Sequence, residues 1–295
     1  MPNVKFKNHL HLHFLVFIAG FTAILGESIT IEAIPLVWYR MTIAGILMFV
    51  FLRYKRIKLS IPSKVKIRFF LAGVVIALHW ITFFAAIKIS NISVTLAMFS
   101  TGAFFTSLIE PLFYKRQIIS YEIIFGLIVM VGVAMIMQIE GEYFYGIILG
   151  ISSAFFSSLF AVMNGKFVQN YNAAMLSFYE FISGILFISI FLAFDHKHGF
   201  SASFFNIRLS DFIYLLILAT VCTAYAFIAS VYVMKHITPF SVVLTYNLEP
   251  VYGMIMAFII FPEKERMPVI FYIGASLILL TVLLNAIIKY NKNKN

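Results

Sequence analysis

The strongest constraint on the fold is a series of long apolar runs, each close to the length that crosses a membrane. A helix needs about 20 predominantly apolar residues to cross about 30 Å of hydrocarbon. Because a backbone in lipid must satisfy its own hydrogen bonds, helices are expected here rather than open strands. Roughly ten such runs occur, at 11–26, 35–52, 69–87, 92–113, 121–138, 144–163, 173–194, 211–234, 239–261 and 268–288.

The composition agrees with a chain that is embedded in lipid. Hydrophobic residues make up 62% and charged residues 12%, whereas soluble chains have about half and about a quarter. This excludes a cytosolic enzyme, a secreted binding module and a disordered chain. The single cysteine, Cys222, excludes an intrachain disulfide and a cysteine-based zinc site. The first run is interpreted as a helix rather than a signal peptide, because no small-residue cleavage site follows it.

Basic residues are distributed unevenly among the predicted loops. With the N-terminus inside, 16 of the 22 Lys and Arg residues fall on the cytoplasmic side, five fall outside, and Arg40 lies within a span. The positive-inside rule therefore predicts a multi-pass protein of the inner (plasma) membrane with both termini in the cytoplasm. The same distribution accounts for the net charge of +10 without a nucleic-acid partner.

The two halves of the chain resemble each other. A shift of 148 residues superposes Gly126 on Gly274 and sets Gly102 opposite Pro250. A competing shift of 139 residues aligns the two Glu-Pro dipeptides instead, but it breaks the match between the two glycines. We prefer the 148-residue register in this part of the chain.

Five predicted spans in each half require the second half to enter the membrane in the opposite orientation, because five is an odd number. Inverted repeats are typical of secondary transporters, whose substrate sites lie near the midplane between the repeats. The predicted fold is therefore an all-α integral membrane protein with ten transmembrane helices in two inverted five-helix repeats, 1–143 and 144–295.

Four segments resemble a known family: LVWYRMTIAG at 36–45, HWITFFAAIKIS at 79–90, TYNLEPVYG at 245–253 and FPEKE at 261–265. On these, the sequence resembles EamA-type permeases of the drug/metabolite transporter superfamily over nearly its whole length. Where such proteins carry a Pro and an acidic turn in the first half, this chain has Gly102 and Lys115-Arg116. The resemblance implies ten helices and the export or exchange of small metabolites, amino acids or drugs, without naming the substrate.

Ionisable residues within spans are the first candidates for a site, because each costs about 2.5–3.5 kcal/mol to insert. Glu249 lies about ten residues from either end of its span and precedes Pro250, which is expected to kink the helix by removing a hydrogen bond. A kinked helix would expose Glu249 and Asn247 to a cavity, where they would bind substrate or protons. The alternative is a buried, protonated carboxyl group bonded to a neighbouring helix.

Arg40 and Glu180 each have two interpretations. The planar guanidinium of Arg40 suits a carboxylate or phosphate substrate, but the residue equally suits a fixed structural pairing with Glu27 or Glu32. Glu180, about seven residues from the inner end of its span, lies either in the cavity or in a packed helix interface.

Further candidates lie at similar depth. His79 is placed to relay protons or to bond a neighbouring helix. Trp80 and Tyr225 offer flat faces to an aromatic or cationic ligand, although packing is an equal alternative in a chain with 17% aromatic residues. Thr101 is a weaker polar candidate, and Gly102 joins Pro250 as a predicted helix break.

Motifs typical of enzymes are absent from the sequence. It contains no G-x-S-x-G, no H-E-x-x-H and no phosphate-binding loop. We therefore expect a secondary transporter in the lipid bilayer that binds a small molecule, without metal or cofactor, and whose transport is either coupled to protons or uncoupled. The alternatives are a non-transporting receptor and an intramembrane enzyme.

Overall fold

The computed structural model describes residues 2–115, 117, 120–139, 143–195, 199–246 and 248–292. Throughout these residues the regular structure is helical, with no strand. The predicted all-α membrane class is therefore confirmed.

Seven helices are continuous. They are α1 (Pro2–Ser28), α2 (Ala33–Tyr54), α3 (Ser63–Ile89), α6 (Ser120–Ile139), α7 (Phe144–Phe167), α8 (Ala173–Phe194) and α14 (Val269–Lys292). The short helix α9 (Ala202–Phe205) follows α8 in the sequence.

Three further apolar segments are interrupted. The first consists of α4 (Ile92–Phe99) and α5 (Gly102–Tyr114), and the second of α12 (Pro239–Tyr246) and α13 (Glu249–Ile260). The third is α10 (Leu209–Ala219) and α11 (Ala226–Val233), joined by the π-helical turn η2 (Thr220–Tyr225). Interruptions of this kind leave backbone groups free to contact side chains or a ligand.

Seven segments of the described chain are long and apolar enough to cross a membrane. They are α1, α2, α3, α4 with α5, α7, α8, and α10 with η2 and α11. Shorter apolar stretches at 124–136, 249–260 and 269–281 lie in α6, α13 and α14. The chain is therefore a multi-pass membrane protein, and the number of ten spans stays a prediction.

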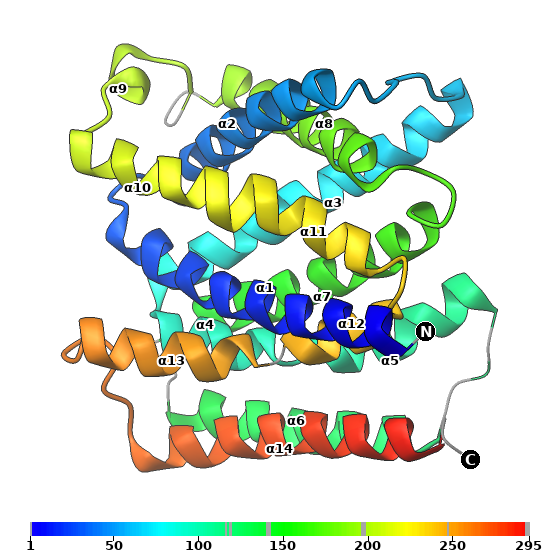
Figure 1. Ribbon diagram of the computed structural model, residues 1–295. Coiled ribbons are helices and arrows are strands. Elements are labelled where there is room, and N and C mark those ends of the chain that lie inside the picture. The colour runs from blue at the N-terminus through cyan, green and yellow to red at the C-terminus, as the bar shows by residue number, and fades with distance from the viewer. Residues whose placement is uncertain are drawn as a thin grey trace.

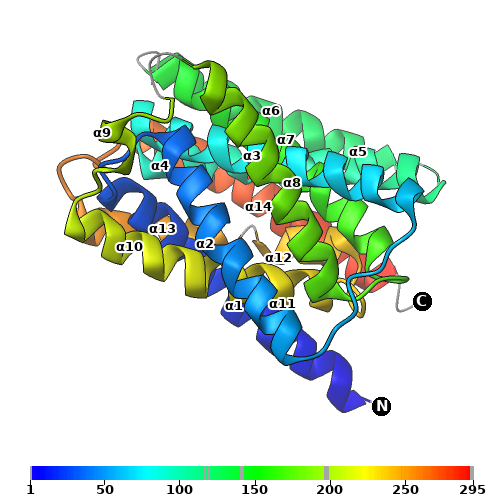
Figure 2. The ribbon, with the colours of Figure 1, turned by 90° about the horizontal axis from the view of Figure 1, so that it is seen from above.

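Helices that are distant in the sequence lie side by side. The main neighbours of α3 are α7 and α8, while α2 packs on α8 and α1 on α13, as Figures 1 and 2 show. Helices α6 and α14 run together along one edge of the bundle (Figure 1). At Gly73 a Cβ atom would meet the backbone of Glu180, so this glycine permits the close contact of α3 with α8.

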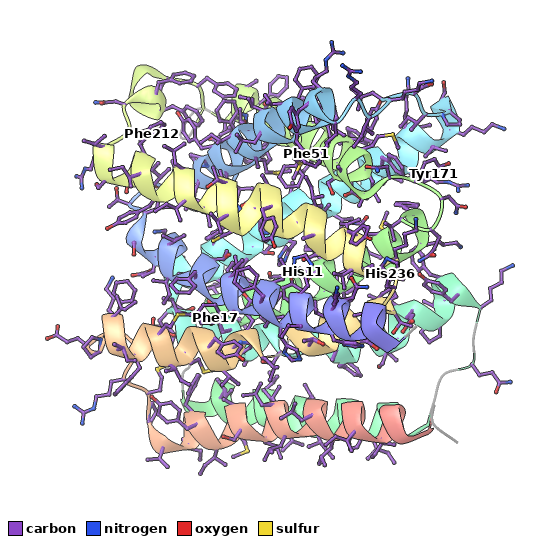
Figure 3. The ribbon with its side chains drawn as sticks, viewed as in Figure 1. His11, Phe17, Phe51, Tyr171, Phe212 and His236 are labelled. Carbon is purple, nitrogen blue, oxygen red and sulfur yellow. The ribbon has the colours of Figure 1, made fainter. Side chains whose placement is uncertain are left out.

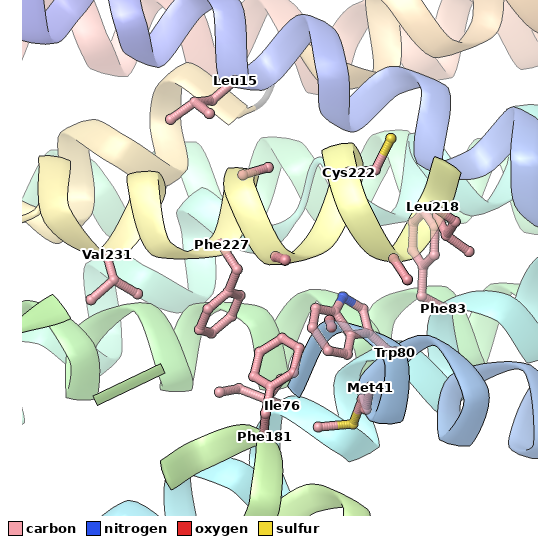
Figure 4. Close-up of a cluster of buried hydrophobic side chains, with 14 of the residues drawn as sticks. Leu15, Met41, Ile76, Trp80, Phe83, Phe181, Leu218, Cys222, Phe227 and Val231 are labelled. Atoms are coloured by element: carbon pink, nitrogen blue, oxygen red, sulfur yellow. The ribbon is translucent and has the colours of Figure 1, made fainter. Parts of the chain in front are cut away.

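Apolar side chains cover the outside of the bundle as well as its interior. Phe51 on α2 is 39% exposed and Phe212 on α10 is 44% exposed; both are labelled in Figure 3. Inside, Trp80, Phe181 and Phe227 form an edge-to-face cluster with ring centroids 5.0–5.8 Å apart (Figure 4). An apolar exterior around an apolar core is what a lipid solvent favours.

The ninth apolar segment differs from its predicted form. Helix α12 ends at Tyr246, and Pro250 lies in the first turn of a new helix that begins at Glu249. A proline in a first turn removes no intrahelical hydrogen bond, because that amide would have no partner in the helix. The segment is therefore divided into two helices rather than kinked at Pro250, which corrects the expectation from the sequence.

The loop after α13 caps the start of α4. Backbone amides of Ile92 and Ser93 donate to the two carboxylate oxygens of Glu265, each at 2.9 Å. The Asn91 side chain accepts from the Val94 amide at 2.8 Å. These contacts tie the C-terminal part of the chain to α4, whose far end borders the cavity described next.

Candidate functional site

A central cavity of about 950 Å³, counting the part that opens to its surroundings, lies among the helices. Side chains from α1, α2, α3, α7, η2, α11, α12 and α13 line it, together with residues on both sides of the α4–α5 break. Of the candidates from the sequence, Arg40, His79, Trp80, Gly102 and Glu249 line it.

Arg40 is held firmly although it lies inside the bundle. It is only 2% exposed, its Nε donates to the Thr223 hydroxyl at 2.6 Å, and its Nη2 donates to the Cys222 carbonyl at 3.4 Å. The guanidinium carbon lies 4.1 Å from the ring centroid of Trp80, a cation–π contact. Its Nη1 is buried and has no hydrogen-bond partner among the described residues.

The sequence suggested a structural pairing of Arg40 with Glu27 or Glu32, and the structure shows other hydrogen-bond partners. Its hydrogen bonds run to η2, and Glu27 bonds to Lys264 Nζ at 2.7 Å. What fixes Arg40 is a π-helical turn that no pattern in the sequence identified.

Glu249 lies at the start of α13, where the positive end of the helix dipole favours a carboxylate. It is 5% exposed and lines the same cavity as Arg40. Beside it, Tyr246 and Ser230 also line the cavity, and their hydroxyl groups are 2.5 Å apart. The cavity thus combines a guanidinium group and a carboxyl group with a hydroxyl pair.

His79 and Trp80 form part of an aromatic wall. The Nδ1 of His79 lies 2.9 Å from the Ser153 hydroxyl and 3.1 Å from the Ser153 carbonyl. Its ring stacks on Phe99 with centroids 5.6 Å apart. The ring therefore bonds a neighbouring helix and also lines the cavity, whereas a proton relay through His79 stays a prediction.

Three other candidates lie outside the cavity lining. Glu180 is fully buried between helices, where its Oε2 accepts from Asn164 Nδ2 at 3.3 Å. The Thr101 hydroxyl donates back to the Met98 carbonyl at 2.7 Å. Tyr225 is 44% exposed and its hydroxyl lies 2.8 Å from His11 Nε2. Asn247 lies outside the described residues.

Several functional candidates were missed in the sequence. Cys222, Ser230 and Tyr246 line the cavity, whereas Thr223 and Ser153 contact residues that line it. Hydroxyl-bearing residues are frequent in all these segments, so only their position in the packed bundle distinguishes them. Among the described residues, no three His, Cys, Asp or Glu side chains gather into a possible metal site.

Comparison with known proteins supplies the family. The chain has the fold of a solved protein crystal structure with 14% sequence identity, a TM-score of 0.65, and coverage of 94% of this chain and 96% of the other. Solved structures provide 26 matching chains in all, and no curated protein matches. The model of the EamA-like transporter family matches residues 9–138 and again residues 144–287. The chain therefore belongs to the EamA-like transporter family, which is part of the drug/metabolite transporter superfamily.

Proposed function

We propose that the protein is a secondary transporter that exports or exchanges small metabolites, amino acids or related compounds, by alternating access. It would act in the inner (plasma) membrane with both termini in the cytoplasm, as the distribution of basic residues favours. The central cavity would bind the substrate.

Ten spans in two inverted repeats, 1–143 and 144–295, form part of this proposal. Support comes from the two separate family-model matches and from the recurring interruptions. Helices α4 and α5 begin at Ile92 and Gly102, and α12 and α13 begin at Pro239 and Glu249. The 148-residue register carries the starts of α4 and α5 to within one residue of the starts of α12 and α13. Paired discontinuous helices near a binding site are typical of inverted-repeat transporters.

The observation that carries the proposal is the pair of buried ionisable side chains, Arg40 and Glu249, in one cavity. A charged residue within a membrane span is costly unless it is compensated, and an unsatisfied buried donor adds to the cost. Arg40 retains an Nη1 group without a hydrogen-bond partner among the described residues, and Glu249 borders the same cavity. A small substrate with an anionic and a cationic group would satisfy both.

In this mechanism Arg40 would hold the anionic group of the substrate, and Glu249 would hold its cationic group or a proton. The aromatic side chains of Trp80, Phe83 and Phe227, which also line the cavity, would surround the apolar part of the substrate. Alternating access requires that the occupied cavity open to each side in turn. If protons drive transport, the substrate and the proton would compete for Glu249.

The first experiment compares metabolites outside cells that express wild-type protein, Glu249→Gln or Glu263→Gln. Glu263 is an exposed carboxylate outside the cavity lining, so its variant is a matched control. We expect a small set of compounds to be enriched outside with wild type and Glu263→Gln but not with Glu249→Gln. No enrichment over empty cells, with correct membrane insertion, would refute export and turn attention to uptake, and after that to a receptor or an enzyme.

Proton coupling is tested separately with the purified protein in vesicles. A pH gradient should drive transport of the enriched compound by wild type, whereas Glu249→Gln should fold and lose proton-linked transport. Equal export and retained pH dependence in Glu249→Gln would keep the carrier but remove Glu249 from the mechanism.

A further inference from the structure

We propose that Thr223 is a positioning residue, which holds Arg40 so that its Nη1 group points into the cavity to receive the carboxylate or other small anionic group of the substrate. The role in substrate binding depends on the proposed transport function. The positioning of Arg40 by Thr223 does not, and it is measured independently below.

The π-helical turn η2 gives the Thr223 hydroxyl a fixed direction. This hydroxyl donates to the carbonyl of Leu218, five residues earlier, at 2.6 Å. Its proton is therefore occupied within the turn, and the lone pairs of the oxygen remain for another donor. Arg40 Nε takes that position at 2.6 Å. Thr223 is fully buried, so water does not compete for either contact.

Two further contacts fix the plane of the guanidinium. The Cys222 carbonyl, also in η2, accepts from Nη2 at 3.4 Å. Trp80 on α3 lies against the face of the group, with its ring centroid 4.1 Å from the guanidinium carbon. The turn thus orients the edge that carries Nε and Nη2, while the tryptophan sets the tilt.

The third guanidinium nitrogen, Nη1, is the one that would bind the substrate. Nη1 is buried and has no partner among the described residues, although Arg40 borders the cavity. A guanidinium whose other nitrogens were free would rotate toward any nearby acceptor. With Nε and one N–H of Nη2 already bonded, Nη1 is the guanidinium nitrogen that has no partner among the described residues and remains for an anion. Thr223 does not line the cavity itself, so it acts through Arg40.

The test of positioning uses the fluorescence of Trp80. The chain has two tryptophans, and Trp38→Phe leaves Trp80 as the only one. In that background we compare Thr223→Val, which removes the hydroxyl at similar size, with Thr223→Ser, which retains it. Thr220→Val is the matched control, because the Thr220 hydroxyl donates to the carbonyls of Leu216 and Ile217 in the preceding helix α10.

Thr223→Val should shift or quench the Trp80 emission, whereas Thr223→Ser and Thr220→Val should match the parent protein. Thr223→Ala provides a second hydroxyl-free variant if Thr223→Val does not insert. Unchanged emission in both hydroxyl-free variants would overturn the positioning role. Equal changes in Thr223→Ser or Thr220→Val would also overturn it, because they would indicate a general packing effect.

The anion-binding role is read from transport of the compounds found with wild type. If Thr223→Val misplaces Arg40, its KM should rise about tenfold with little change in kcat. This factor corresponds to the loss of one hydrogen bond to a charged group. Thr223→Ser retains the hydroxyl, so its KM should stay within about twofold of the wild-type value. A twofold change is a small fraction of the free energy of that hydrogen bond. Altered emission with unchanged KM would refute the anion site alone, whereas the absence of any wild-type transport would refute the proposed function.

Discussion

Replacement of Glu265 is expected to loosen the start of α4. This carboxylate is 1% exposed and accepts hydrogen bonds from the amides of Ile92 and Ser93, each at 2.9 Å. It reaches α4 from the loop between α13 and α14. Glu265→Ala removes both acceptors and the negative charge at the N-terminus of α4, while Asn91 still caps the Val94 amide.

The expected magnitude follows from these contacts. A hydrogen bond to a charged group contributes about 1.5–3 kcal/mol, and the charge at the helix end adds about 0.3–1 kcal/mol. Allowing for partial rescue by water and by Asn91, we expect a loss of about 2–4 kcal/mol in the free energy of local opening of α4. This corresponds to roughly 30- to 1,000-fold faster amide exchange. Glu265→Gln, which keeps one acceptor oxygen, should give a smaller increase.

Hydrogen–deuterium exchange of the purified protein, read on peptides that cover 90–99, measures this opening directly. Glu263→Ala is the matched control, since Glu263 is exposed and lies two residues away in the same loop. Exchange in α7 serves as an internal reference. If Glu265→Ala leaves exchange of α4 at the wild-type rate, or if Glu263→Ala accelerates it equally, the capping argument is wrong.

Three other changes test the packing, the charges and the placement of one candidate. Gly73→Ala should lower the free energy of unfolding by about 1–3 kcal/mol, because its Cβ would meet the backbone of α8; thermal unfolding in detergent measures this, and an unchanged Tm would contradict it. The hydrogen bond with Glu27 raises the pKa of Lys264, whose side chain is exposed. The pair therefore stabilises the fold at neutral pH and loses its effect only as the pH rises through the raised pKa. Lys264→Met should accordingly cause a small loss of Tm at neutral pH that disappears at high pH, whereas a loss that grows with pH would contradict the assignment. Tyr225→Phe removes the contact with His11 outside the cavity and should leave KM for the exported compound unchanged; a raised KM would place Tyr225 at the site.

Most of the membrane architecture was predictable from local sequence. Apolar runs of sufficient length are expected to form helices in lipid whatever their neighbours are, which is why the helical class needed no tertiary information. The family resemblance likewise rested on short segments, among them the one around Arg40, and the family-model matches agree with it.

The interruptions were only partly predictable. The two predicted breaks, Gly102 and Pro250, lie next to interruptions, since α5 begins at Gly102 and Pro250 follows the start of α13 at Glu249. The turn η2 was missed altogether, because a π-helical turn has no composition that separates it from the α-helix around it. Its position is defined by the contacts of Thr223 with Leu218 and Arg40.

The sequence by itself determined that the chain crosses a membrane and which ionisable groups lie within its spans. Only the tertiary structure decided which of those groups meet. Arg40 and Glu249 border one cavity, whereas Glu180 is buried between helices against Asn164. The insertion cost makes every ionisable residue within a span a candidate for a site, but it does not show which of these residues face one another. The direction in which its side chain points depends on how each helix rotates and packs against its neighbours, and that is a property of the whole bundle.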